Sequence, residues 1–236
     1  MKRFFPLFIL TIAAAVGAWA SHGNGDAVKD GEAFIHGFGC ERCHTIGGKG
    51  GDYGPDLTYV GFRKSREWLD LWLKDPHGWK SNTVMPNLHL SEDVRASLVA
   101  YLSSLKGDSY RLSTPWNHAS VKENSAKRGE MIFNKAGCVG CHGRAGVGGN
   151  PNNNVAGNKI PTLTLVADGY SREELLTKIK VGVPKPLKDD PSGPEPMIHM
   201  PAWGQVLKDD ELESLADYLI SLKPKAAGGA ATKDDW

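Results

Sequence analysis

Apolar side chains recur at intervals of three and four residues in two segments of the chain, one before its middle and one near its end. This spacing is typical of an amphipathic helix. It predicts one helix that begins at Ser91 and another that begins at Asp209, each with acidic residues in its first turn, where they complement the helix dipole. The positions that carry the two patterns are Val94, Leu98, Tyr101, Leu102 and Leu105, and Leu212, Leu215, Tyr218, Leu219 and Leu222.

Two further helices are indicated by residues that favour helix ends. Ser65 and Ser171 stand where helices are predicted to begin, and Ser171 forms a capping box with Glu174 three residues later. The helix after Ser65 must end near Lys74, because Pro76 follows. No run of alternating apolar and polar residues is long enough to predict a strand. The pattern therefore predicts an all-α fold.

The chain matches itself in three segments, which indicates an internal duplication. The offset between the copies is 98 residues in the first segment, 106 in the second and 117 in the third. It increases only where glycine, asparagine and proline are dense, and such stretches tolerate loop insertions. The chain thus contains two copies of one fold. The matching ranges are 31–40 with 129–138, 55–69 with 161–175, and 90–106 with 207–223.

The repeat also predicts the domain boundaries. The first domain covers 21–107 and the second covers 125–223. The segment between them, 108–124, is rich in Ser, Asn and Pro and is predicted to be a connector. Residues 224–236 are predicted to be a flexible tail rich in Ala and Gly.

Residues 1–20 have the pattern of a secretory signal peptide. Two basic residues precede an apolar run at 4–16, and the small residues Ala18 and Ala20 fit a cleavage site. We expect cleavage after Ala20 and export to the periplasm. An uncleaved membrane anchor is the alternative, although an apolar stretch of about 17 residues is short for a span, which needs about 20.

Composition and charge add two constraints. With 28 Gly and 14 Pro among 236 residues, the fold is expected to be rich in loops. Removal of residues 1–20 takes two of the 28 basic residues and no acid, which leaves 26 basic against 27 acidic ones. A formal charge of −1 excludes a general attraction to nucleic acid.

A domain of about 90 residues has a small core, so it needs a disulfide, a metal or a cofactor for stability.

All four cysteines belong to a C-x-x-C-H motif, which occurs once in each copy. Disulfides and a shared zinc site are the alternatives, but each cysteine pair has its own histidine and the pairs lie 98 residues apart. C-x-x-C-H is the attachment signature of c-type haem, in which two sulfurs form thioethers with the porphyrin and the imidazole binds the iron. We predict two covalently attached haems c: haem 1 on Cys40, Cys43 and His44, and haem 2 on Cys138, Cys141 and His142.

A methionine followed by proline lies downstream of each motif and before the last helix of each copy. Met85 and Met200 are therefore predicted to be the distal iron ligands of haem 1 and haem 2. Met197 and His199 remain alternatives for haem 2, but the separation of Met200 from the last helix is closer to that of Met85. The tryptophans interpreted as packing around a porphyrin are Trp68, Trp72, Trp79 and Trp203.

With these motifs the chain resembles the class I cytochromes c, in a tandem diheme form similar to cytochrome c4 and to diheme subunits of bacterial respiratory chains. The resemblance covers about 27–106 and 125–223. It implies that each domain has three to four helices wrapped around one covalent haem. It also implies that the carbonyls of Pro55 and Pro161 accept hydrogen bonds from the proximal histidines.

The same resemblance implies a close crossing of the first and last helices of each domain. A glycine in the first helix lets the two backbones nearly touch. The expected contacts are those of Gly31 and Ile35 with Leu98 and Tyr101, and those of Gly129 and Phe133 with Leu215 and Tyr218.

The sequence predicts an electron carrier and not an enzyme, because protein ligands on both sides of each iron leave no position for a substrate; no catalytic residue is predicted. The expected partners are redox proteins: a quinol- or substrate-oxidising donor and a terminal oxidase or reductase as acceptor. The first alternative is a cytochrome subunit of a membrane-bound oxidoreductase complex, attached only through an uncleaved N-terminal helix. The second is a diheme enzyme, such as a peroxidase or a thiosulfate-oxidising cytochrome.

Overall fold

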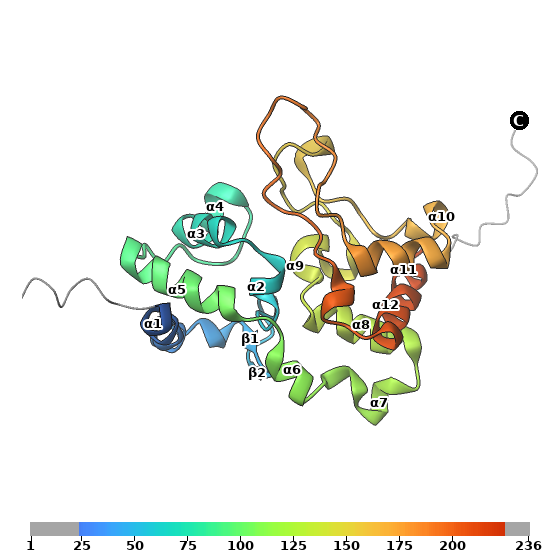
Figure 1. The fold of residues 1–236 in the computed structure, drawn as a ribbon, viewed down its shortest axis with the longest axis horizontal. Helices are drawn as coiled ribbons and strands as arrows, with labels where there is room; N and C mark the ends of the chain where they lie inside the picture. Colours follow the sequence, from blue (N-terminus) through green and yellow to red (C-terminus); the bar gives the residue numbers. More distant parts are fainter. Residues whose placement is uncertain (1–23, 225–236) are drawn as a thin grey trace, which may run out of the picture.

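A computed structural model describes residues 24–224 of the chain. The predicted signal peptide at 1–20 and all but the first residue of the predicted tail at 224–236 lie outside the described residues. Figure 1 shows two mostly helical bodies side by side, with a short helical segment passing between them below. These bodies correspond to the two copies of the sequence repeat, and we refer to them as domain 1 and domain 2.

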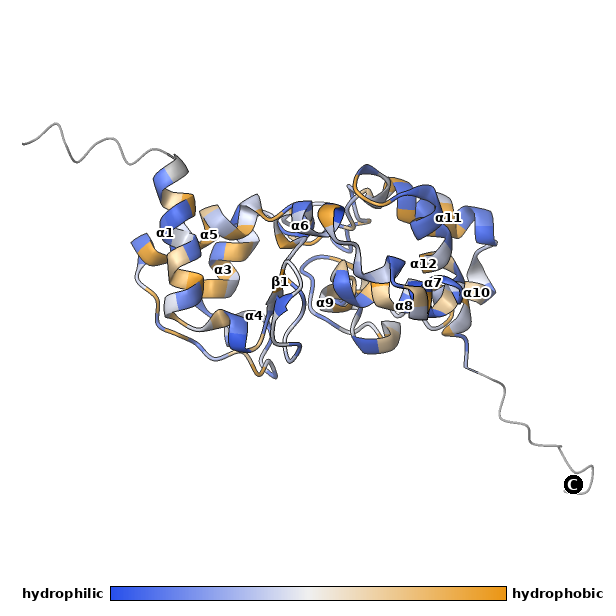
Figure 2. Ribbon diagram, turned by 90° about the horizontal axis from the view of Figure 1, so that it is seen from below, coloured by the Kyte–Doolittle hydropathy of each residue, from blue (hydrophilic) through white to orange (hydrophobic). Residues whose placement is uncertain are grey.

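Domain 1 is built from short helices around a long helix pair. The pair is α1 (Asn24–Gly37) and α5 (Glu92–Ser104), which pack against each other. The smaller elements are the 3₁₀ turn η2 (Cys40–Arg42), β1 (Thr45–Ile46), β2 (Lys49–Gly50), α2 (Val60–Arg63), α3 (Arg66–Lys74) and α4 (Pro76–Trp79). In Figure 2, hydrophobic and hydrophilic residues succeed one another along α1, α3 and α5, as expected for helices with one buried face.

Domain 2 repeats this plan with a second long pair. The pair is α8 (Ser125–Lys135) and α12 (Asp209–Ser221). Between them the chain forms α9 (Val139–His142), η4 (Arg144–Gly146), η5 (Ala156–Asn158), α10 (Val166–Gly169), α11 (Arg172–Val181) and η6 (Trp203–Gln205). The predicted all-α class and the two tandem domains are confirmed.

Domain 1 contains one short hairpin that the sequence pattern did not predict. Strands β1 and β2 pair antiparallel, with Thr45 opposite Gly50 and Ile46 opposite Lys49. Gly47 and Gly48, with φ of 60° and 82°, make the tight turn between them. Two-residue strands are too short to produce an alternating pattern, so the sequence carried no strand signal here.

The close helix crossing implied by the resemblance is present in both domains. A side chain at Gly31 would collide with the backbone of Ser97 and with Cβ of Tyr101. A side chain at Gly129 would collide in the same way with Ser214 and Tyr218. Glycine is therefore required at both crossings, because no residue with a Cβ atom fits without separating the helices.

The predicted helix ends are also confirmed. The Ser65 side chain accepts a hydrogen bond from the Trp68 amide at 3.2 Å, and α3 ends at Lys74. Ser171 and Glu174 form the predicted capping box at the start of α11. Helix α5 has Ser91 as its N-cap, and α12 begins at Asp209.

The segment predicted as a connector, 108–124, is folded and packs against domain 2. It contains α6 (Asp108–Leu112), η3 (Pro115–Asn117) and α7 (Ala119–Lys122). Trp116 is 1 % exposed, and its indole N–H donates to Glu211 Oε1 at 2.7 Å. The backbone oxygen of Trp116 accepts from the Arg128 guanidinium at 3.3 Å. The connector therefore fixes one side of domain 2.

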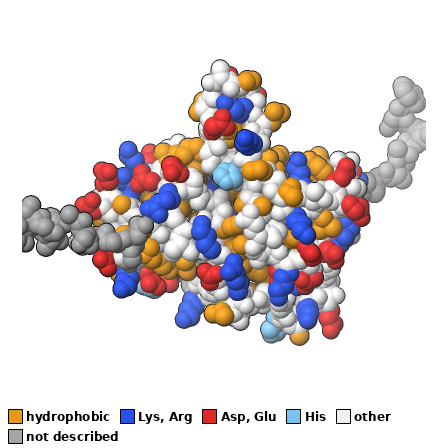
Figure 3. Space-filling model, viewed as in Figure 1, with side chains coloured by type: hydrophobic (Ala, Val, Ile, Leu, Met, Phe, Trp, Pro, Cys, Tyr) orange, Lys and Arg blue, Asp and Glu red, His pale blue; other side chains and the backbone are white. Residues whose placement is uncertain are grey.

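The two insertions that lengthen domain 2 form one projection, at the top of Figure 1. The side-chain amides of consecutive asparagines in the first insertion hydrogen-bond to the backbone of the second. Asn152 bonds to Ile198, Asn153 to Glu195 and Met197, and Asn154 to Asp190 and Pro194. Figure 3 shows that this projection rises from a face on which cationic and anionic side chains are interspersed.

Aromatic side chains connect the two domains. The centroid of the Trp203 ring lies 6.1 Å from the Tyr59 centroid and 5.3 Å from the Phe62 centroid, and both rings meet Trp203 edge-on. Trp203 and Tyr59 are almost fully buried. The interface is therefore a packed apolar contact. Among the helices of residues 24–224, none combines the length and the hydrophobicity that a bilayer-spanning segment requires.

Candidate functional site

The first C-x-x-C-H motif spans a 3₁₀ turn and places its imidazole against a backbone carbonyl. The amide of His44 donates to Cys40 O at 3.0 Å, which closes the turn. The ring Nδ1 of His44 lies 2.8 Å from the Pro55 carbonyl oxygen, so Nδ1 carries the proton in this contact. A neutral ring protonated at Nδ1 presents the Nε2 lone pair to a metal.

The second motif forms helix α9 and is more deeply buried. The amide of His142 donates to Cys138 O at 2.9 Å. Among residues 24–224, Nδ1 of His142 is buried without a hydrogen-bond partner, so the bond to the Pro161 carbonyl that the resemblance implies is not formed, unlike that of His44 to Pro55. Burial lowers the pKa of His142 to about 4, and the nearby Pro161 carbonyl opposes that shift only in part. The ring is therefore neutral at physiological pH, as a metal ligand must be.

The four cysteines of the two motifs have free thiols. Within residues 24–224, which include all four cysteines, no three His, Cys, Asp or Glu side chains are grouped as a zinc site requires. Burial raises the pKa of the Cys138 thiol to about 12 and also raises that of Cys40. Neither thiol is activated for redox chemistry as a free group.

The cysteines of both motifs pack in apolar clusters that also contain methionines. Cys40 and Met85 pack in the same cluster, together with Trp68 and Trp72, and so do Met197 and Cys141 of the second motif. Cys138 and Met200 pack in the other, together with Trp203. Paired thiols, a neutral imidazole, an apolar lining and a thioether fit a covalently attached haem with histidine and methionine ligands. Cys40, Cys43, His44 and Met85 would hold haem 1, and Cys138, Cys141, His142 and Met200 would hold haem 2.

The two alternatives to Met200 differ in their surroundings. Met197 packs against the cluster that contains Cys40 and also Cys141 of the second motif, and its amide donates to Asn153 Oδ1 at 2.7 Å. His199 is exposed. The backbone of Met200 pairs with Val183, which holds the Met200 loop against α11. Met200 shares the cluster of the buried Cys138, which favours it as the distal ligand of haem 2.

Sequence reasoning missed a polar contact to the sulfur of Met85. The indole N–H of Trp72 donates to Met85 Sδ at 2.9 Å. The Trp72 ring stacks on Trp68 with 5.3 Å between centroids, and Trp79 meets Trp68 edge-on. Trp72 therefore orients the thioether of site 1. The sequence signal for this contact was the position of Trp72 one helical turn after Trp68. That spacing is equally typical of two side chains that only pack in a core.

Sequence reasoning also missed that domain 1 supplies part of the second site. The Pro55 ring lies 3.6 Å from the place that a Cβ on Gly140, between the cysteines of the second motif, would occupy. Lys80 of domain 1 donates to Asn150 Oδ1 at 2.8 Å, and Asn150 donates to Cys141 O at 2.7 Å. Arg63 and Lys64 of domain 1 are buried against the same motif. Interdomain contacts of this kind leave no periodic pattern in a sequence.

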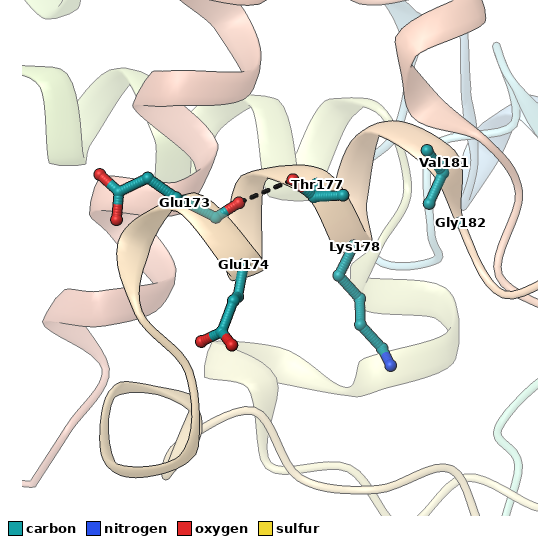
Figure 4. Close-up of a pocket in the computed structure, with 6 residues that line it drawn as sticks. All are labelled: Glu173, Glu174, Thr177, Lys178, Val181 and Gly182. Carbon is teal, nitrogen blue, oxygen red and sulfur yellow. Dashed lines mark hydrogen bonds between the residues drawn. The ribbon is translucent and has the colours of Figure 1, made fainter.

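A shallow hollow on domain 2 is unrelated to these sites. It is lined by residues of α11 and the glycine that follows it, as Figure 4 shows. None of the predicted haem-binding residues lines it. Since a single helix forms the hollow, it lacks the converging groups of a ligand site. The lining residues are Glu173, Glu174, Thr177, Lys178, Val181 and Gly182.

Comparisons with known proteins agree with this reading of the motifs. The family model described as Cytochrome c matches the chain twice, at residues 28–106 and 126–223. No curated protein matches the chain. A solved structure from the Kuenenia stuttgartiensis reducing HAO-like protein complex is similar over 83 % of this chain and 96 % of that chain, with 17 % sequence identity and a TM-score of 0.29. So low a score supports no functional argument.

Proposed function

Because the chain belongs to the cytochrome c family, we propose that it is a periplasmic diheme electron carrier in which two His/Met-ligated haems pass single electrons between redox proteins. Its cytochrome c domains indicate haem-based electron transfer. The finer proposal concerns the number of haems, their ligands, the location and the partners.

One observation carries the proposal: for each C-x-x-C-H motif, a predicted methionine packs in the same apolar cluster as one of its cysteines. Met85 shares a cluster with Cys40, and Met200 shares a cluster with Cys138. An iron bound by protein on both sides changes its oxidation state without exchanging a ligand. Such an iron suits electron transfer and offers no position to a substrate. Methionine opposite histidine also raises the reduction potential.

The proposed partners are redox proteins that dock transiently: a quinol- or substrate-oxidising donor and a terminal oxidase or reductase. Contacts of this type are small. The near-neutral charge of the chain and the interspersed charges of the face in Figure 3 are compatible with a carrier that dissociates readily. The periplasmic location is supported by the signal-like pattern of residues 1–20.

The first test is spectroscopic and uses the full natural protein. An alkaline pyridine spectrum should count two haems per chain. Magnetic circular dichroism and electron paramagnetic resonance should then show two low-spin ferric irons, each with a methionine sulfur ligand. A high-spin iron at neutral pH would mean an open coordination position and would support the diheme enzyme instead.

The second test concerns the location. The intact mass of the native protein should correspond to a chain that begins at Ser21 and carries two haems. A mass that includes residues 1–20 would overturn the free carrier and support a membrane-anchored cytochrome subunit.

A further inference from the structure

In both motifs an arginine guanidinium lies against the glycine that precedes the first cysteine. A Cβ on Gly39, whose φ is 68°, would lie 2.8 Å from Nε of Arg42. A Cβ on Gly137, whose φ is 83°, would lie 2.5 Å from Cζ of Arg63. Gly39 and Gly137 are equivalent in the repeat. The two arginines are not equivalent, because Arg42 belongs to the first motif itself whereas Arg63 comes from domain 1 and contacts domain 2.

The second motif has no arginine of its own at this position. The motifs read C-E-R-C-H and C-V-G-C-H, so the residue equivalent to Arg42 is Gly140. A Cβ on Gly140 would lie 3.3 Å from Nη1 of Arg63. The guanidinium of Arg63 therefore approaches the place where a side chain at position 140 would begin. Domain 1 therefore supplies an arginine at the place where the second motif has only Gly140.

The environments of the two arginines differ in burial. Arg42 is exposed, whereas Arg63 is 6 % exposed and donates from Nη2 to Asp56 O at 2.8 Å. Nε of Arg63 is buried and has no hydrogen-bond partner within residues 24–224. A charge in water is strongly screened, and the same charge in a protein interior acts over a longer distance.

The positive charge near the second motif is not neutralised by acids. Lys64, which follows Arg63, is 8 % exposed, lies beside Cys141 and has its Nζ over the Trp68 ring, 3.9 Å from the ring centroid. In the described part of the chain, neither Arg63 nor Lys64 has a carboxylate within ion-pair distance. The carboxylate of the buried Asp56 accepts from Tyr110 and pairs with Lys135. A buried cation without an ion-pair partner, such as Arg63, is costly, so it points to an anionic or electron-accepting group nearby.

We propose that Arg63 places a guanidinium at haem 2, across the domain interface, where the first motif has its own exposed Arg42, and that Arg63, because it is buried, raises the reduction potential of haem 2. This inference rests on the proposed function, because it requires a haem on the second motif. Reduction adds one electron from a redox partner to the iron and forms or breaks no bond. A buried cation stabilises the form with the additional negative charge. Arg63 is a positioning residue that links the second site to domain 1.

The test compares Arg63→Gln with Arg42→Gln in the full diheme protein by spectroelectrochemical titration. Arg63→Gln should lower the equilibrium constant for reduction of one haem at least tenfold, which is 59 mV for a one-electron couple. Arg42→Gln should change either constant less than threefold, because its charge is screened by water. Arg63→Lys should restore most of the lost potential, which a role in packing alone would not predict.

A second pair of variants tests the position as well as the charge. Gly140→Arg in an Arg63→Ala background places an arginine within the second motif, as in the first. It should recover part of the potential lost in Arg63→Ala alone, with the other haem unchanged. If the arginine at position 140 brings no recovery, or if both haems shift equally in Arg63→Gln, the inference is wrong.

The haem count separates this failure from failure of the proposed function. Fewer than two haems per wild-type chain would overturn the proposed function, and this inference with it. Two haems whose potentials are unaffected by Arg63→Gln would overturn only the inference.

Discussion

The two C-x-x-C-H sites share their cysteines and histidine and have different surroundings. At the first site, the His44 ring is held by the Pro55 carbonyl at 2.8 Å, and the neighbouring Cys43 is exposed. At the second site, burial lowers the pKa of His142 to about 4, and its Nδ1 has no partner among residues 24–224. Cys138 is 8 % exposed. Duplication therefore preserved the chemistry of the motif, while the environment of each copy was set by what packs against it.

The difference arises from the position of each motif relative to the interface. The first motif packs against its own domain and is partly exposed to solvent. The second motif faces domain 1, whose Pro55 and Arg63 lie against Gly140 and Gly137. The comparison teaches that one domain of this pair completes the site of the other. Four predictions test this asymmetry, and they are ordered by expected effect.

The largest effect should come from removing the thioether bonds of one site at a time. Cys138→Ala with Cys141→Ala should lower the haem count from two to one and weaken the domain interface, because Cys138 lies in the core cluster that also contains Tyr59 of domain 1. Cys40→Ala with Cys43→Ala should also remove one haem but leave the second site intact. The alkaline pyridine spectrum measures the haem count of each variant, and the thermal unfolding curve measures its stability. Equal losses of thermal stability in the two variants would contradict the asymmetry.

Loss of a distal ligand should have the next largest effect. Met200→Ala should lower the reduction equilibrium constant of one haem by more than tenfold, about 59 mV, because a methionine ligand favours the reduced iron. Met85→Ala should do the same for the other haem. Met197→Ala is the matched control and should change neither constant by more than about twofold. A larger change in Met197→Ala than in Met200→Ala would assign the ligand to Met197.

The third prediction concerns an arginine clamp that only domain 2 has. The Arg128 guanidinium donates to five oxygen atoms and is 7 % exposed in its side chain. Arg128→Ala should lower the free energy of unfolding of domain 2 by about 1.5–3 kcal/mol, the range for hydrogen bonds to charged groups. Arg95→Ala in domain 1, where the guanidinium contacts only Asp70 and Leu90, should cost about 1 kcal/mol. Urea unfolding followed at each haem measures the two losses, and a reversed order would refute the comparison.

The smallest expected effect is a loss of stability of domain 2 at low pH. Hydrogen bonding to Arg128 holds the pKa of Asp210 below its usual value. A carboxyl with a lower pKa in the folded state stabilises the fold above its unfolded pKa of about 3.9 and loses that contribution as the pH falls through the folded pKa. Since Asp210 is largely exposed, we expect less than about 1 kcal/mol.

The measurement is the urea midpoint of domain 2 at about pH 3 and about pH 5, on either side of the unfolded pKa. Asp210→Asn should show a smaller decrease between the two than the wild type. Asp93→Asn is the control, because Asp93 occupies the equivalent position in domain 1 and faces no equivalent arginine: position 30, which matches Arg128, is an aspartate. If the urea midpoint decreased equally in Asp210→Asn and in the wild type, the Asp210–Arg128 pair would not be the source of the pH dependence.

Local features of the fold were predictable from the sequence. The N-cap at Ser65, the capping box at Ser171 and the end of α3 at Lys74 follow from side chains within a few residues of each other. The helix crossings at Gly31 and Gly129 were implied by the resemblance to a known family. The β1–β2 hairpin was missed, because two residues per strand produce no pattern.

The sequence by itself determined the motif chemistry, the duplication and the helices, because these depend on neighbouring residues and on similarity between two copies. Only the tertiary structure decided that Met200 shares a cluster with Cys138 and that Arg63 of domain 1 lies against Gly137 of domain 2. A repeat alignment compares each domain with its counterpart and carries no information on contacts between them. Those contacts depend on how two whole surfaces fit, and here that fit places two copies of the C-x-x-C-H motif in different surroundings.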